Sequence, residues 1–250
     1  MKFDEICLHV EGIPYLSSQK AKVLYEFIMD KKPSECLELG FAHGVSVCYV
    51  AAALDELGTG HITAVDLKRG MEWQKPSIEY LLSKTGLGEY VTIGRESLSY
   101  TWFLKKEIEK CTVDQTCTPV YDFCYIDGPK NWTNDGCTFF LVDKLLKPNG
   151  HILFDDFSWT YDKSDEWSIQ KLEEAGFLVS QMEEDERETP HIELVFKLLV
   201  MQHPDYSGFV IQKENWAWAQ KTRYQGEKTL VIKEDFSTSN VLRRILRRLA

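Results

Sequence analysis

Three aspartates follow apolar runs that are typical of buried strands. The stretch "YDFCYIDGPKNW" ends its apolar run at Asp127, and "HILFDDFSW" ends its own at Asp155 and Asp156. Carboxylates that gather at neighbouring strand ends repel one another unless a cation, a proton or a basic partner offsets their charge. Mg²⁺ is a hard cation that prefers carboxylate oxygens and water as ligands. The three aspartates are therefore candidate metal ligands.

A glycine-containing loop and a further aspartate suggest a second kind of chemistry. In "LELGFAHGVS", Gly40 permits a tight turn and Gly44 lets the backbone approach a ligand closely. Asp66 ends the next apolar run, 22 residues beyond Gly44, where a carboxylate can accept hydrogen bonds from two ribose hydroxyls. The spacing G-x3-G differs from the dinucleotide fingerprint G-x-G-x-x-G. The set favours a ligand that carries adenosine and little phosphate.

Short apolar runs alternate with helical patterns and must position these residues. Such alternation predicts an α/β domain on a parallel sheet, in which ligands bind beyond the carboxyl ends of the strands. Strands are expected at 35–40, 61–66, 90–94, 121–127 and 151–157, and helices at 17–32, 44–58, 77–88, 101–110 and 138–150, the last one stopped by Pro148 and Gly150.

The part of the chain after Trp159 is less regular. A helix is expected at 164–176, a helix or alternatively a strand at 191–202, and a strand or hairpin at 208–222. The last residues, "VLRRILRRLA", form a basic amphipathic pattern that can lie on an anionic membrane or dock on an acidic partner. The expected division is an N-terminal helical segment (1–34), a central domain (35–225) and a C-terminal extension (226–250).

Composition excludes several classes of protein. A formal net charge of -10 argues against a general nucleic-acid binder, which needs a basic surface. Apolar runs fall short of the roughly 18 residues that span a bilayer, and the N-terminus lacks the apolar stretch of a signal peptide. The 7 cysteines include no CxxC pair, which favours a reducing cytoplasm and argues against a zinc site.

The motifs "CLELGFAHGVSV", "ITAVD", "IDGPK" and "LLKPNGHILFDD" occur in the order seen in class I S-adenosylmethionine-dependent methyltransferases. The chain resembles that family over roughly residues 17 to 160. The resemblance implies a Rossmann-like, doubly wound, mostly parallel seven-stranded sheet with helices on both faces. It also implies S-adenosylmethionine as cofactor, bound by Glu38, Gly40, Gly44, Ser46, Asp66, Glu96, Ser97 and Asp127.

The second half resembles the divalent-metal-dependent O-methyltransferases of the catechol, caffeoyl-coenzyme A and macrolide-sugar type. The resemblance implies that Asp127, Asp155 and Asp156 hold Mg²⁺ or another divalent cation, and that Lys130 is the general base. Chelation of two neighbouring oxygens lowers the pKa of the acceptor hydroxyl and fixes its line of attack on the sulfonium methyl. The expected acceptor is a small molecule with adjacent oxygens, such as a glycan sugar or a catechol-like ring.

Alternatives stay open at this point. A methyltransferase without metal, a nucleotide-dependent oxidoreductase and a non-catalytic binding or assembly protein share parts of the pattern. Trp159, Tyr161 and Trp167 fit a lid over the acceptor or a core under a long loop, whereas Trp216 and Trp218 fit core packing better. The expected partners are a small-molecule acceptor and a second copy of the chain, with no nucleic acid. The basic C-terminal helix leaves self-association or peripheral membrane contact open, in an otherwise cytoplasmic protein.

Overall fold

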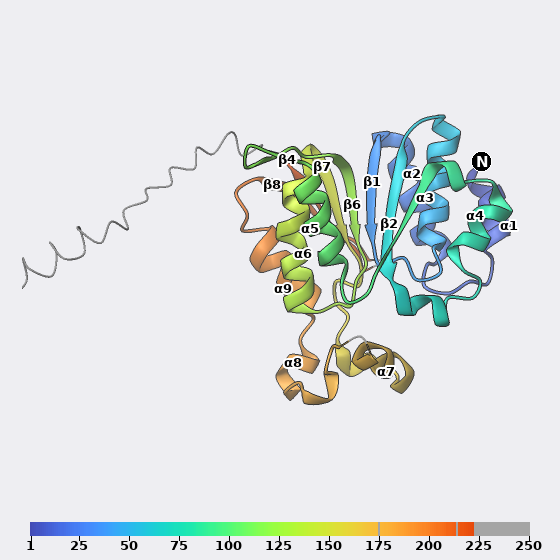
Figure 1. The fold of residues 1–250 in the computed structure, drawn as a ribbon. Coiled ribbons are helices and arrows are strands. Elements are labelled where there is room, and N and C mark those ends of the chain that lie inside the picture. Colours follow the sequence, from blue (N-terminus) through green and yellow to red (C-terminus); the bar gives the residue numbers. More distant parts are fainter. Residues whose placement is uncertain (175, 214, 223–250) are drawn as a thin grey trace, which may run out of the picture.

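A seven-stranded sheet organises the chain (Figure 1). The computed structural model describes residues 1–174, 176–213 and 215–222. The strand order is β3-β2-β1-β6-β7-β9-β8; the first five of these strands run parallel, and β9 is antiparallel to both β7 and β8. The strands are β1 (Glu35–Leu39), β2 (His61–Leu67), β3 (Val91–Glu96), β6 (Tyr121–Ile126), β7 (Leu146–Phe154), β8 (Tyr206–Ile211) and β9 (Ala217–Lys221), and a separate two-stranded sheet pairs β4 (Thr112–Val113) with β5 (Thr116–Cys117).

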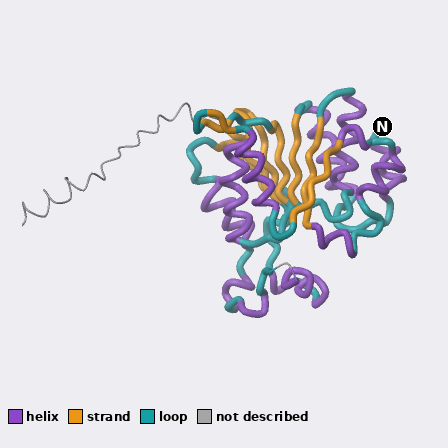
Figure 2. Tube along the Cα trace, in the orientation of Figure 1, coloured by secondary structure: helices purple, strands orange, loops and turns teal. Residues whose placement is uncertain are grey.

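Helices cover both faces of the sheet. α1 to α4 lie on one face and α5, α6 and α9 on the other, as the purple segments flanking the orange strands show (Figures 1 and 2). The α-helices are α1 (Phe3–Val10), α2 (Ser18–Lys31), α3 (Val45–Leu57), α4 (Ile78–Thr85), α5 (Tyr100–Lys110), α6 (Trp132–Leu145), α7 (Glu166–Glu174), α8 (Glu184–Glu188) and α9 (His191–Leu194). Short 3-10 helices are η1 (Lys68–Glu72), η2 (Gly88–Tyr90), η3 (Tyr161–Lys163) and η4 (Val179–Gln181), and α9 continues as the π-helix η5 (Val195–Val200).

Two hydrophobic clusters hold these layers together. One joins α2 and α3 to the sheet through side chains such as Leu24, Val47 and Phe123, and the other joins α5 and α6 through side chains such as Leu104 and Phe139. Because both faces of the central strands are buried, these strands are nearly continuous apolar runs. The structure confirms the predicted α/β, mostly parallel seven-stranded fold.

The predicted boundaries of one helix are wrong. The helix expected at 138–150 begins at Trp132 and ends at Leu145, and β7 begins at Leu146 rather than at His151. Pro148 has no amide hydrogen to continue a helical ladder, which explains the early end. Leu146 instead pairs with Tyr121, and the register shifts before His151 resumes the parallel ladder. Residues 147–150, which lie between Leu146 and His151, are therefore part of β7.

The chain between β7 and α9 forms an insertion beyond the carboxyl ends of the strands. It carries α7 and α8, which lie apart from both helical layers (Figure 1). The expected helix at 164–176 corresponds to α7, the one at 191–202 to α9 with η5, and the expected hairpin to β8 and β9. Within the described residues, none of the helices combines the length and the apolar character needed to cross a membrane. The predicted C-terminal helix lies outside the described residues.

Candidate active site

The loop between β1 and α3 reaches the carboxyl ends of the central strands. Gly40 and Gly44 both have positive φ, +92° and +84°. A side chain at Gly40 would overlap the backbone carbonyl of Asp127, and one at Gly44 would overlap the side chain of Ile78. Both positions therefore need glycine for conformation and for space. The close approach of Gly40 to Asp127 joins the loop to the acidic strand ends.

Asp66 lies at the end of β2 and holds the same loop. Its carboxylate accepts hydrogen bonds from the amides of Ala42 (2.8 Å), Phe41 (3.2 Å) and Leu67 (2.6 Å) and from Gln74 Nε2 (2.9 Å). Burial raises the pKa of Asp66 above its ordinary value despite these donors. Asp66 also lines the main cavity, where a ribose could meet its remaining lone pairs. It fixes the loop as well, a role that the sequence pattern did not suggest.

Glu38 and Ser46 lie behind the loop rather than on the cavity wall. Glu38 is fully buried, Ser46 Oγ donates a hydrogen bond to its Oε1, and its Oε2 has no hydrogen-bond partner. Burial raises the pKa of Glu38 well above its ordinary value, and the nearby carboxylates of Asp127, Asp66 and Asp155 add to the increase. Glu38 is thus an enclosed acid that holds Ser46, at the start of α3, behind the loop.

Glu96 is the last residue of β3, and Ser97 follows it. Glu96 is buried and paired with Lys106 of α5. Neither residue is among those lining the main cavity, whereas Leu98, Ser99 and Tyr100 are. A cofactor-binding role for Glu96 and Ser97 stays a prediction.

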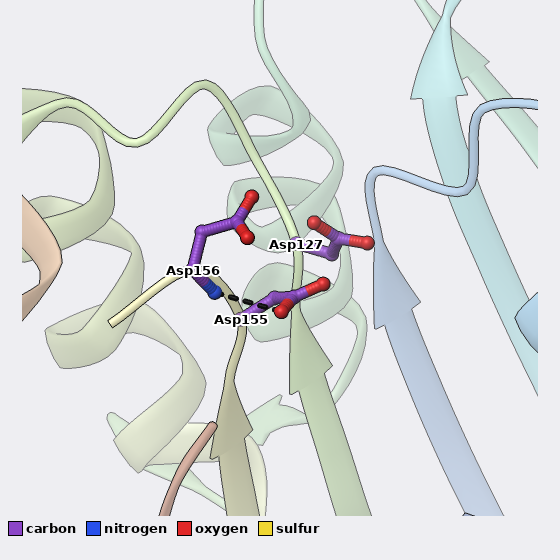
Figure 3. A group of neighbouring side chains, drawn as sticks. All are labelled: Asp127, Asp155 and Asp156. Carbon is purple, nitrogen blue, oxygen red and sulfur yellow. Dashed lines mark hydrogen bonds between the residues drawn. The ribbon is translucent and has the colours of Figure 1, made fainter. Parts of the chain in front are cut away.

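The three aspartates converge at the ends of two neighbouring strands (Figure 3). Asp127 directly follows β6, and Asp155 and Asp156 directly follow β7. One carboxylate oxygen from each residue lies within 4.8 Å of the others. Burial and the neighbouring Asp155 and Asp156 together raise the pKa of Asp127 to about 7, against the lowering effect of Lys130. The carboxylates face one another closely enough to share a cation.

Two lysines offset this negative charge. Lys130 Nζ hydrogen-bonds to Asp127 Oδ1 and lies 3.5 Å from Asp156 Oδ2. Lys20, which the sequence pattern did not single out, comes from α2 and pairs with Asp155 Oδ1 at 2.7 Å. Burial lowers the pKa of Lys130, but the three carboxylates outweigh that effect and raise it above its ordinary value. Lys130 is therefore an ammonium group while its carboxylate neighbours are free of other cations.

The loop that carries Lys130 is fixed on both sides. Lys130 itself has a positive φ of 61°. The next amide, of Asn131, donates to Asp135 Oδ2 (2.7 Å), and the amide of Trp132 donates to Nδ1 of the buried His191 (3.0 Å). These contacts keep the Lys130 side chain over the acids.

The site lines a cavity of about 500 Å³ between the strand ends and the insertion. Trp159 and Trp167 of the insertion line it, as expected for a lid. Tyr161 is buried instead and donates a hydrogen bond to the carbonyl of Pro129 (3.2 Å). The cavity-lining residues Tyr15, Lys20, Arg69 and Trp73 were missed, because they lie in segments that carry no recognisable motif. Trp216 and Trp218 are buried in the core, as predicted.

Residues 37–157 match the family model described as "Methyltransferase domain". Three solved structures share the fold. The S-adenosylhomocysteine-bound methyltransferase PaMTH1 of Podospora anserina has 16% identity and a TM-score of 0.60, with 88% of each chain covered. The O-methyltransferase TomG of Streptomyces achromogenes, bound to S-adenosylmethionine, has 15% identity and a TM-score of 0.59, covering 88% of this chain and 89% of TomG. An O-methyltransferase of Bacillus cereus in complex with S-adenosylhomocysteine has 16% identity and a TM-score of 0.58, covering 88% of this chain and 90% of the other. A search of curated proteins found no significant match.

Proposed function

We propose that the chain is an S-adenosylmethionine-dependent methyltransferase and that it methylates a hydroxyl group of a small molecule with two adjacent oxygens, since residues 37–157 match the methyltransferase domain family model. A sugar or a catechol-like ring fits this description. The convergence of Asp127, Asp155 and Asp156 on the same cavity as the glycine loop and Asp66 carries the proposal. TomG and the Bacillus cereus protein, which share the fold, are both named O-methyltransferases.

The three carboxylates fit a divalent cation. They offer oxygen ligands, the type that Mg²⁺ and Mn²⁺ prefer, and these lie within 4.8 Å of one another. The raised pKa of Asp127 reflects burial and the two neighbouring acids, a combination that a dication would relieve. When bound, such a cation would lower the pKa of a chelated acceptor hydroxyl.

The residues of the chain have distinct proposed roles. Asp66 would accept hydrogen bonds from the cofactor ribose, and the loop from Gly40 to Gly44 would face its methionine part. Lys130 would receive the proton of the acceptor hydroxyl. Since free carboxylates raise the Lys130 pKa, it can accept a proton only when those carboxylates are engaged by a cation. The acids and the base would thus act as one unit.

A Mn²⁺-binding measurement on the protein saturated with S-adenosylhomocysteine tests the metal site. We expect Asp127→Asn and Asp156→Asn each to weaken Mn²⁺ binding by at least about tenfold, because each variant removes one ligand charge. Asp162→Asn, which removes an exposed carboxylate of the insertion, is the matched control and should bind like the wild type. Equal Mn²⁺ affinity in all four proteins would contradict the metal site.

A turnover assay tests the reaction itself. With S-adenosylmethionine and a panel of vicinal diols and catechols, we expect S-adenosylhomocysteine release that EDTA abolishes and Mg²⁺ restores. Binding of S-adenosylhomocysteine, measured by calorimetry, should survive EDTA because its proposed contacts do not include the cation. Failure to bind S-adenosylhomocysteine would instead favour a non-catalytic role.

A methyltransferase that needs no metal is the second candidate. Lys20 and Lys130 together pair with all three carboxylates, so the cluster already has two positive charges beside it. In that case Lys130 would position the acceptor by hydrogen bonding, and turnover would be the same with EDTA and with Mg²⁺. The EDTA arm of the assay separates the two candidates.

A further inference from the structure

Four cationic side chains line the cavity, and three of them have acidic partners. Lys20 pairs with Asp155, Lys130 with Asp127 and Asp156, and Lys171 with Glu174 at 2.7 Å. Arg69 of η1 is the fourth, and its Nε and Nη2 are buried without a hydrogen-bond partner in the described structure. Arg69 therefore differs from the other cations of the cavity.

The acids around Arg69 do not satisfy it. Glu174 of α7 already accepts hydrogen bonds from Lys171 Nζ (2.7 Å) and Gln170 Nε2 (2.9 Å). Glu72, on the same 3-10 helix as Arg69, is exposed. Arg95 on the neighbouring strand differs, since its Nη1 donates to Gln74 (2.6 Å) and its Nη2 to Glu79 (3.3 Å), and of its three nitrogens only Nε is without a hydrogen-bond partner in the described structure. Arg69, by contrast, has two adjacent nitrogens without a partner and lines the cavity.

The two unpartnered atoms of Arg69 define the chemistry of that ligand. Nε and Nη2 form one edge of the guanidinium, and this edge donates two parallel hydrogen bonds to a carboxylate or a phosphate. Leaving buried donors unsatisfied is costly, and an oxyanion can accept from both donors of this edge at once. Trp73 and Trp167 line the same cavity with their rings 5.8 Å apart at 88°, which forms an apolar corner near it.

We propose that Arg69 receives an oxyanion, a carboxylate or a phosphate, carried by the methyl acceptor. This inference rests on the proposed function and narrows its substrate class to anionic acceptors. Arg69 follows β2 and the proposed ribose ligand Asp66, and it lines the same cavity as Lys171 and Glu174 of the insertion. The methionine part of the cofactor is expected at the loop from Gly40 to Gly44 instead. The Arg69 edge is thus left to the other ligand of the cavity.

Thermal unfolding with inorganic phosphate as the probe tests the site without knowledge of the acceptor. The wild type, Arg69→Met and the control Lys68→Met, an exposed cation of the same 3-10 helix, are compared in phosphate and in chloride of equal ionic strength. Each protein is measured alone and saturated with S-adenosylhomocysteine. We expect phosphate to raise the melting temperature of the wild type and of Lys68→Met in both states, and to have a clearly smaller effect on Arg69→Met.

Arg69→Lys keeps the charge and loses the two-donor edge, so it should show an intermediate effect and covers the case in which Arg69→Met does not fold. A phosphate effect that is absent in the wild type, or equal in the wild type and the Arg69 variants, would overturn the proposal. A second pair of results would also overturn the proposal: S-adenosylhomocysteine abolishes the phosphate effect, and Arg69→Met binds S-adenosylhomocysteine at least tenfold more weakly than the wild type. The oxyanion that binds Arg69 would then be the carboxylate of the cofactor.

The same samples separate this inference from the proposed function. If the wild type binds S-adenosylhomocysteine and Mn²⁺ but shows no phosphate effect that depends on Arg69, only the anion site is contradicted. If the phosphate effect depends on Arg69 but the wild type binds neither S-adenosylhomocysteine nor Mn²⁺, the anion site is supported and the proposed reaction is contradicted.

Discussion

At the scale of single residues, charge balance is the main property of the site. Asp127, Asp155 and Asp156 could be predicted from the sequence because each follows an apolar strand. Lys20 could not be, since it lies in α2, more than a hundred residues earlier, and only the packing of α2 beside the sheet brings it to Asp155. Its ammonium also lies 5.3 Å from the ring centroid of Trp216, a contact between buried elements that no local pattern encodes.

Lys20 and a divalent cation would compete for Asp155. Because Lys20 Nζ lies 2.7 Å from Asp155 Oδ1, replacing it with methionine removes one positive charge beside the proposed metal ligands. We expect Lys20→Met to bind Mn²⁺ about tenfold more tightly than the wild type, with a difference that shrinks at high salt. Electron paramagnetic resonance titration of free Mn²⁺ measures this directly.

The control for this prediction is Lys22→Met. Lys22 lies on the same helix, its side chain is 63% exposed, and its nearest acidic partner is Glu26. It should leave Mn²⁺ affinity unchanged. Weaker Mn²⁺ binding by Lys20→Met would contradict the competition and would mean that Lys20 instead holds Asp155 in a binding orientation.

At the scale of elements, the strands that end at the site and the helix α7 were predictable, whereas the placement of the insertion was not. Apolar runs bounded by glycine and acid locate β1, β2, β6 and the end of β7, and parallel topology then gathers their carboxyl ends at one edge. The start of β7 was missed because Leu146 belongs equally well to a helical pattern. The position of α7 over the cavity depends on tertiary contacts, such as that of Trp73 with Trp167, that lack a signal in the sequence.

Asp122 links three elements at the opposite end of the sheet. Its carboxylate accepts from the amide and hydroxyl of Ser34 (3.0 and 2.7 Å), from the amide of Glu35 in β1 (3.0 Å) and from Lys147 in β7 (3.0 Å). Burial would raise the pKa of Asp122, but these donors outweigh it and lower the pKa below its ordinary value. The carboxylate therefore stabilises the fold in its charged form.

The lowered pKa predicts how the stability contribution of Asp122 depends on pH. Because the folded-state pKa lies below the unfolded value of about 3.9, the contribution is complete well above that pH and is lost as the pH falls through the folded-state pKa. We expect Asp122→Asn to lower the free energy of unfolding by about 1 kcal/mol at pH 7 and by less at pH 3. Urea unfolding of both proteins at the two pH values measures the difference. A difference that stays constant would contradict this account.

At the scale of the whole molecule, the described sheet, both hydrophobic clusters and the cavity are formed by residues within 1–222. The chain has a formal net charge of -10, whereas the last ten residues contain four arginines and no acid. This asymmetry is what the predicted division into a central domain and a basic C-terminal extension rests on. The boundary predicted at residue 225 falls just after the last described strand, β9, which pairs with both β7 and β8.

Truncation at residue 225 tests that separation. Since none of the described strands or cavity-lining residues is removed, the truncated chain should bind S-adenosylhomocysteine with the affinity of the full chain, as measured by calorimetry.

Because the removed segment is basic and amphipathic, we expect the full chain to self-associate more than the truncated one in light scattering, with the difference reduced at high salt. A replacement of Arg243, Arg244, Arg247 and Arg248 by glutamine should reproduce the loss of association at full length. If that variant associates as the wild type does but no longer sediments with anionic vesicles, the extension binds membranes rather than a second copy. Loss of S-adenosylhomocysteine binding on truncation would mean that the extension is part of the methyltransferase domain.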